Sequence, residues 1–168
     1  MESYKGKLSL EAVVLDKYLN KYNRCKIRKH SLERRKNELR KEFDSPLKAV
    51  RMDGMPRGSS SNVGCAAISY EIDEIETRIN EKIEELKKEY VKINDIIGFL
   101  PENSTERSII EYKYIDGFSW KKICELEHIT RTPATQYWRK GLYQLLGFAK
   151  IQEIVREYEK EIEERRQS

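Results

Sequence analysis

The chain has 168 residues and a net charge of +4; 37% of the residues are charged and only 38% are hydrophobic. This hydrophobic fraction is low for a globular domain of this size and is typical of long exposed helices. No segment approaches the roughly 18 consecutive apolar residues of a membrane span, and the N-terminus lacks the apolar core of a secretory signal, so we expect a cytoplasmic protein without membrane partners.

The first predicted element is a long amphipathic helix that ends at Asp44, before Pro46. Apolar or aromatic side chains recur along it in alternating steps of three and four residues. The positions of this seam, of which all but the two lysines are apolar or aromatic, are Leu15, Tyr18, Tyr22, Cys25, Lys29, Leu32, Lys36, Leu39 and Phe43. The other faces carry mostly Lys and Arg, so the helix is strongly basic away from its seam.

Residues 44 to 64 are rich in Pro, Gly and Ser and have no apolar periodicity, which predicts a flexible connection. A second amphipathic helix follows, with Glu and Lys alternating outside its seam. Its seam positions are Ile68, Ile72, Ile75, Ile79, Lys82, Leu86, Tyr90, Ile93 and Ile97. Because neither helix can bury its seam alone, we predict an antiparallel hairpin over residues 1–100 with basic and acidic flanks in contact. Dimerisation through the same seams is the alternative, and a homo-oligomer built on the hairpin is expected.

Three short helices are predicted in the part of the chain that follows the hairpin. They span about residues 106–115, 120–127 and 133–146. Asn103 followed by Glu106 indicates a cap for the first, and Ser119 is placed to cap the second after a turn at Asp116-Gly117. Thr132 with Pro133 supplies a cap and a first-turn proline for the third.

The third short helix has one apolar face and one polar, basic face. The apolar face is predicted to pack, and consists of Ala134, Tyr137, Trp138, Gly141, Leu142 and Leu145. The preceding short helix is predicted to pack through Trp120, Ile123, Cys124 and Leu126. The outward face of the third helix carries Arg131, Thr132, Thr135, Gln136, Arg139, Lys140 and Tyr143. No acidic residue occurs between Ile129 and Ala149, which suits contact with a polyanion.

These features predict a double-stranded DNA-binding helix-turn-helix within residues 101–147. Arg and Gln can each make bidentate contacts to base edges in the major groove, while Thr and Lys hold phosphates. A short helix, a tight turn and a capped second helix form the geometry that docks in that groove. The candidate DNA contacts are Arg131, Thr132, Thr135, Gln136, Arg139, Lys140, Lys121 and Lys122.

The last segment, residues 148–168, is predicted to form an amphipathic helix with a charged tail. Its apolar positions are Ile151, Ile154, Val155, Tyr158 and Ile162. The tail, Glu163 to Arg166, is expected to fray. The chain as a whole is therefore predicted to be all-α, with a long coiled-coil-like hairpin followed by a helix-turn-helix module.

Residues 106–146 (ERSIIEYKYIDGFSWKKICELEHITRTPATQYWRKGLYQLL) resemble the fourth conserved region of sigma-70-type bacterial sigma factors. The whole layout is similar to small phage and prophage proteins that include late-gene transcription regulators of the ArpU/RinA type. The resemblance implies an activator of phage late genes, with RNA polymerase as a further partner. It assigns DNA contacts to Arg131, Thr132, Thr135, Gln136, Arg139 and Lys140. Pro133, Ala134 and Gly141 depart from the sigma pattern, and a glycine inside a helix costs about 1 kcal/mol relative to alanine.

Two other functions remain open: a small terminase-like subunit that recognises phage DNA for packaging, and a coiled-coil adaptor that contacts RNA polymerase without reading DNA. An enzyme is the least favoured class, because His30 and His128 stand alone and no phosphate-binding loop motif is present. The three cysteines, Cys25, Cys65 and Cys124, lack the spacing of zinc sites, so neither a metal nor a cofactor is expected.

Overall fold

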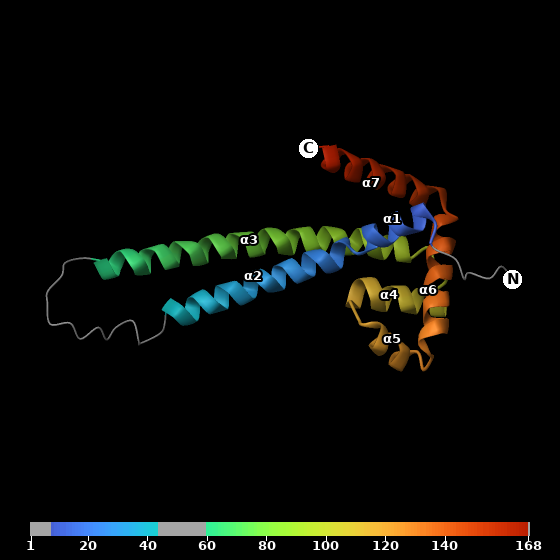
Figure 1. Ribbon diagram of the computed structural model, residues 1–168, viewed down its shortest axis with the longest axis horizontal. Helices are drawn as coiled ribbons and strands as arrows, with labels where there is room; N and C mark the ends of the chain where they lie inside the picture. Colours follow the sequence, from blue (N-terminus) through green and yellow to red (C-terminus); the bar gives the residue numbers. More distant parts are fainter. Residues whose placement is uncertain (1–7, 44–59, 168) are drawn as a thin grey trace. The chain divides into compact units, whose positions relative to one another are not determined.

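The computed structural model describes residues 8–43 and 60–167, and within these residues the fold is all-α, as predicted (Figure 1). The elements are α1 (Leu10–Leu19), α2 (Lys21–Phe43), α3 (Ser60–Ile97), α4 (Thr105–Glu111), the π-helical turn η2 (Tyr112–Asp116), α5 (Trp120–Leu126), α6 (Arg131–Leu146) and α7 (Ala149–Gln167). None of the helices in the described ranges is long and apolar enough to cross a membrane.

The chain forms two compact units, one of Met1–Arg24 with Lys87–Ser168 and one of Cys25–Leu86. This division differs from the predicted boundary at residue 100, because α1 and the last turns of α3 belong to the unit that contains the helix-turn-helix. The apolar side chains of α1 pack in this first unit, where Leu15 and Leu19 are fully buried in the core.

The predicted first long helix is present but bends at Asn20, where α1 and α2 meet. Ser9 caps α1 by accepting a hydrogen bond from the backbone N–H of Ala12 (3.2 Å). The side-chain amide of Asn20 donates to the carbonyl oxygen of Asp16 (2.9 Å). The backbone N–H of Asn20 donates to the same carbonyl oxygen (3.1 Å), so the side chain shares this acceptor with the helical hydrogen bond at the bend.

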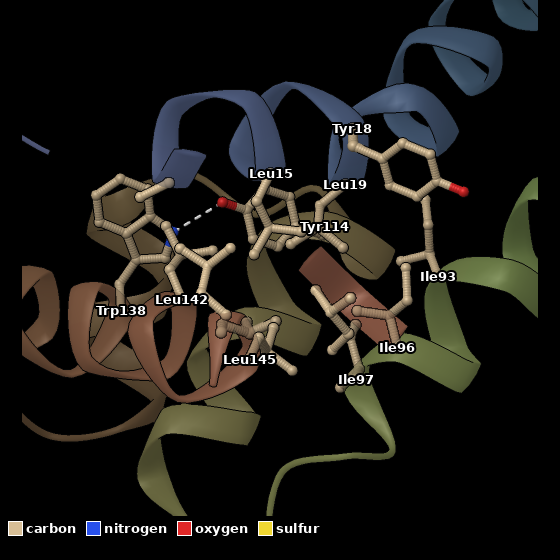
Figure 2. Packing of buried hydrophobic residues seen from close by; sticks show 14 of the residues in the cluster. Leu15, Tyr18, Leu19, Ile93, Ile96, Ile97, Tyr114, Trp138, Leu142 and Leu145 are labelled. Atoms are coloured by element: carbon tan, nitrogen blue, oxygen red, sulfur yellow. Dashed lines mark hydrogen bonds between the residues drawn. The ribbon is translucent and has the colours of Figure 1, made fainter. Parts of the chain in front are cut away.

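One apolar core holds the first unit together, and Figure 2 shows side chains from four elements pointing into it. The labelled members are Leu15, Tyr18 and Leu19 of α1, Ile93, Ile96 and Ile97 of α3, Tyr114 of η2, and Trp138, Leu142 and Leu145 of α6. Helix α7 joins this core through Ile151, Val155 and Tyr158, and the Tyr158 ring meets Tyr18 edge-on with centroids 5.3 Å apart. Helix α7 continues to Gln167 and so includes the tail Glu163 to Arg166, which is exposed, while Ile162 packs against the core.

The second unit is the predicted antiparallel hairpin, made of α2 from Cys25 and α3 up to Leu86. The thiol of Cys25 lies 3.8 Å from the carbonyl oxygen of Lys82, and farther along α2 the Arg40 guanidinium lies 2.7 Å from the Glu76 carboxylate. The two helices therefore run antiparallel. The expected contact between basic and acidic flanks is confirmed within a single chain.

The connection between the two hairpin helices is shorter than predicted. Residues 44–59 lie outside the described residues, and residues 60–64 already belong to α3. The sequence contains no proline after Pro56 and before Pro101, so nothing prevents a helix from starting at Ser60.

Candidate nucleic-acid interface

The first helix of the predicted module begins with a different cap from the one expected. Ser104, not Asn103, caps α4: its hydroxyl accepts from the backbone N–H of Arg107 at 3.2 Å, while Asn103 is exposed. The helix ends in η2, and the predicted turn follows at Gly117. Gly117 has φ 73°, and a Cβ there would lie 2.9 Å from the Asn23 side-chain oxygen, so the close contact with α2 requires glycine.

A tight turn joins α5 to α6, as predicted. Ser119 caps α5 by accepting from the backbone N–H of Lys122 at 3.3 Å, which confirms its predicted role. The turn closes through His128, which has φ 53°, and through a hydrogen bond from the Ile129 N–H to the Cys124 carbonyl (3.1 Å).

Helix α6 begins two residues earlier than predicted. Its N-cap position is Thr130 rather than Thr132, and Arg131 is its first residue. Pro133 is therefore the third helical residue, where a backbone N–H would have no partner inside the helix, so proline is tolerated. The earlier start places Arg131 and Thr132 in the first turn of α6, where both are exposed.

Close packing between α4 and α6 accounts for the glycine inside α6. A Cβ at Gly141 would lie 2.5 Å from the Cδ1 atom of Ile110 and 3.4 Å from the Cβ of Glu106. Glycine at this position lets the two helices approach each other across fully buried Ile110. The close packing of α4 on α6 therefore depends on the lack of a side chain at residue 141.

The predicted packing faces need two corrections. On α6, Ala134, Trp138, Leu142 and Leu145 are buried as expected, but Tyr137 is 37% exposed. On α5, Ile123 is fully buried and Trp120 and Cys124 are half-buried, whereas Leu126 is 39% exposed. Both exceptions lie at the margin of an apolar stripe, where spacing alone does not show how far the neighbouring helix reaches.

A buried chain of hydrogen bonds holds α6 in place. The Trp138 indole N–H donates to the Tyr114 hydroxyl (2.9 Å; Figure 2), which donates to the Asp16 carboxylate (2.6 Å). Burial raises the pKa of Tyr114 well above its ordinary value, and the negative charge of Asp16 raises it further. The phenol therefore stays neutral and continues to donate its hydrogen bond to Asp16. Its hydroxyl thus links α1, η2 and α6 through hydrogen bonds.

The open part of α6 is its N-terminal half. Arg131, Thr132 and Gln136 are all exposed there. The Arg131 guanidinium lies 4.2 Å from the centre of the Trp120 ring, and the Lys113 ammonium lies 4.8 Å from the same centre. Burial lowers the pKa of Lys113; the charge of Asp16 opposes this shift and that of Arg131 adds to it. The aromatic ring thus gathers two cations at the start of α6.

The remaining candidate contacts on α6 are engaged within the protein. The Lys140 ammonium lies 2.5 Å from the carboxylate of Glu106, a residue that is only 6% exposed. The Tyr143 hydroxyl accepts from the backbone N–H of Ser9 (3.1 Å), and Arg139 is half-buried. The Thr135 hydroxyl donates to the carbonyl oxygen of Arg131 (2.9 Å). On the predicted outward face, Arg131, Thr132 and Gln136 are therefore open, whereas Lys140 and Tyr143 contact residues outside α6.

The two candidate lysines of α5, Lys121 and Lys122, are exposed, and Lys122 lies 3.8 Å from Glu125. Beside them is an open groove of about 530 Å³ that the sequence did not reveal. Its lining consists of Trp120, Lys121, Cys124, Glu125, Ile129 and Arg131. The only sequence signal for it is the apolar character of the half-buried residues on this side of α5.

Within the described ranges, no His, Cys, Asp or Glu side chains cluster in a way that could hold a metal ion, and Cys25 and Cys124 form no disulfide. The side chain of Cys65 lies outside the described residues. No protein-family model, curated protein or solved structure matches the chain.

Proposed function

We propose that the protein is a transcription regulator that binds double-stranded DNA by inserting the N-terminal half of α6 into the major groove. The observation that carries this proposal is the joint exposure of Arg131, Thr132 and Gln136 on a helix whose opposite face is packed. In helix-turn-helix proteins, the N-terminal residues of the second helix contact base edges. The open half of α6 is the half that such docking uses.

Three exposed side chains in this half have a defined chemical role in the proposed complex. Arg131 can form a bidentate contact with guanine and Gln136 with adenine, whereas Thr132 holds a phosphate. Contact with the Trp120 ring limits the freedom of the Arg131 side chain before binding, which lowers the entropic cost of ordering it on DNA. Lys121 and Lys122 are assigned to the flanking phosphates.

The biological setting is a further part of the proposal. The resemblance to sigma-factor modules and to ArpU/RinA-type proteins supports a cytoplasmic activator of phage late genes that works with RNA polymerase. A homo-oligomer would place two copies of α6 on the same duplex, with half-sites one helical turn or a multiple of it apart. The half-buried positions of the hairpin seam, such as Leu32 and Leu39, are the proposed contact surface for this oligomer.

The decisive experiment selects bound fragments from a phage genome and then measures affinity for the selected site and for an arbitrary duplex. We expect Arg131→Ala and Gln136→Ala each to weaken site binding by roughly 1 to 3 kcal/mol. Arg131→Lys keeps the charge but loses the forked geometry, so it should lower discrimination more than affinity for arbitrary DNA. Gln144→Ala, an exposed position in the C-terminal half of α6, is the matched control.

Unchanged site affinity in Arg131→Ala and Gln136→Ala would contradict this assignment. Fragments enriched upstream of a late operon would support the regulator, whereas enrichment at a packaging start would favour the terminase-like alternative.

The groove beside α5 favours one other function, an adaptor that docks a protein partner. The groove has half-buried apolar walls, and Leu126 and Phe118 of the same module are 39% and 37% exposed. An adaptor would show no DNA binding even at low salt. Its contact with RNA polymerase would instead weaken when Cys124 or Ile129 in the groove is replaced by a charged residue, while Gln144→Ala would leave that contact unchanged.

A further inference from the structure

The α2 helix of the hairpin exposes a basic face. It consists of Arg28, Arg34, Arg35 and Lys41, which we call the basic face and which are all exposed. Arg34 lies 3.9 Å from Glu38, and both side chains are more than two-thirds exposed. Within the described part of the chain, no hydrogen bond or ion pair engages the other three. These cations therefore keep most of their capacity for an external anion.

Three other basic residues of this helix form ion pairs within the hairpin. Lys29 pairs with Glu33 (2.9 Å), and Lys36 and Arg40 both pair with Glu76 of α3 (3.5 and 2.7 Å). The exposed surface of α3 is rich in carboxylates, which include Glu71, Asp73, Glu74 and Glu81. The α2 side of the hairpin is thus more positive than the α3 side, which favours the approach of a polyanion from the side of α2.

We propose that the basic face binds the phosphate backbone of double-stranded DNA without reading its sequence. The inference rests on the proposed function for the identity of the polyanion. Arginine forks bind phosphate oxygens bidentately, and three of the four cations are arginines. From Arg28 to Lys41 the helix rises about 20 Å, which matches roughly six base-pair steps of DNA.

The placement of the four residues around the helix fits a single contact surface. At about 100° per residue, their side chains fall within roughly 140° of the circumference, outside the seam that faces α3. The exposed carboxylate of Glu38 falls within the same arc, so the face carries four cations and one anion. Contacts of this type supply affinity that depends on salt and not on sequence. In this assignment α6 discriminates between sites, and the basic face adds to binding at every site.

The test compares two full-length variants that carry the same change in charge. The first is Arg28→Gln/Arg34→Gln/Arg35→Gln/Lys41→Gln. The control is Arg156→Gln/Lys160→Gln/Arg165→Gln/Arg166→Gln, which neutralises four exposed cations of α7. Affinity for a duplex of arbitrary sequence is measured across a salt series, and circular dichroism checks that both variants keep their helical content.

If the basic face contacts phosphates, the slope of log affinity against log salt falls by roughly three to four in the first variant and little in the control. Between about 50 and 200 mM salt, the wild type then loses on the order of 100-fold more affinity than the first variant does. The smaller variant Arg28→Gln/Arg35→Gln, which disturbs the hairpin less, should lower the slope by roughly two.

Equal slopes for the first variant and the control would overturn the inference. So would a variant that dissociates from a dimer while its DNA binding stays unchanged, because the occupant would then be the acidic α3 face of a second copy. Failure of the proposed function has a different signature. In that case no site is preferred over arbitrary DNA, yet neutralising the basic face still flattens the salt dependence.

Discussion

The two units of this protein bury their apolar side chains to different extents. In the first unit, helices from both ends of the chain surround side chains such as Leu15, Ile97 and Leu142, which are fully buried. In the hairpin, Ile75 and Ile79 are buried, but other seam residues such as Leu32 and Leu39 stay half-buried. Two helices cover only one side of each other, and complete burial needs a further layer. The helix-turn-helix thus belongs to the densely packed unit, while the hairpin is a thin two-helix structure.

The largest expected effect comes from the same truncation made in each unit. Leu142→Ala should lower the free energy of unfolding by about 2 to 5 kcal/mol, because it leaves a cavity in a fully packed core. Leu39→Ala should cost about 1 kcal/mol, since this side chain buries less apolar area. Urea-induced unfolding of both variants measures the difference. Equal losses of unfolding free energy would contradict the difference in burial between the two units. They would indicate that another surface, such as a second copy, covers the hairpin seam.

An intermediate effect is expected from the buried polar chain of the first unit. Tyr114→Phe removes the hydroxyl that accepts from Trp138 and donates to Asp16. A buried N–H without a partner costs about 1 to 3 kcal/mol, so unfolding should occur at lower urea concentration by that amount. Tyr70→Phe, at a position that is 73% exposed, is the control and should change little. Indistinguishable stabilities would show that the chain of hydrogen bonds does not hold α6.

The same tyrosine makes stability depend on alkaline pH. The pKa of Tyr114 is raised in the folded protein, mainly by burial and then by the charge of Asp16. An unfolded tyrosine ionises near pH 10, so the stability that the neutral phenol contributes is complete below about pH 10. It is lost as pH rises from there through the folded pKa. Urea unfolding between about pH 9 and 11 should show a shallower alkaline decline for Tyr114→Phe than for the wild type; identical declines would contradict this origin.

The smallest effect is expected in the hairpin, where charged contacts are partly open to solvent. Glu76→Gln removes the partner of Lys36 and Arg40, and such exposed pairs contribute less than about 1 kcal/mol, with screening by salt. Hydrogen exchange should speed up slightly in α2 and α3 at low salt and not in α6. Glu81→Gln, at an exposed position outside these pairs, is the control. Equal acceleration in α6 would show that the two units do not open separately.

Local signals predicted much of the helix-turn-helix. The turn at Gly117, the cap at Ser119 and the buried stripe through Trp138 follow from residue chemistry and helical spacing within a few residues. The position of Tyr137 outside that stripe did not follow, because spacing shows which side of a helix is apolar but not how wide a surface its neighbours cover.

The sequence alone determined the all-α class, the two-helix hairpin with oppositely charged flanks, and the absence of carboxylates along α6. Only the tertiary structure decided that α1 packs with α6 and α7, that Lys140 pairs with Glu106, and that Gly141 permits close contact with Ile110. The physical reason is the range of each interaction. Caps, turns and periodicity depend on residues within a few positions, whereas these contacts join segments that the chain brings together only when it folds.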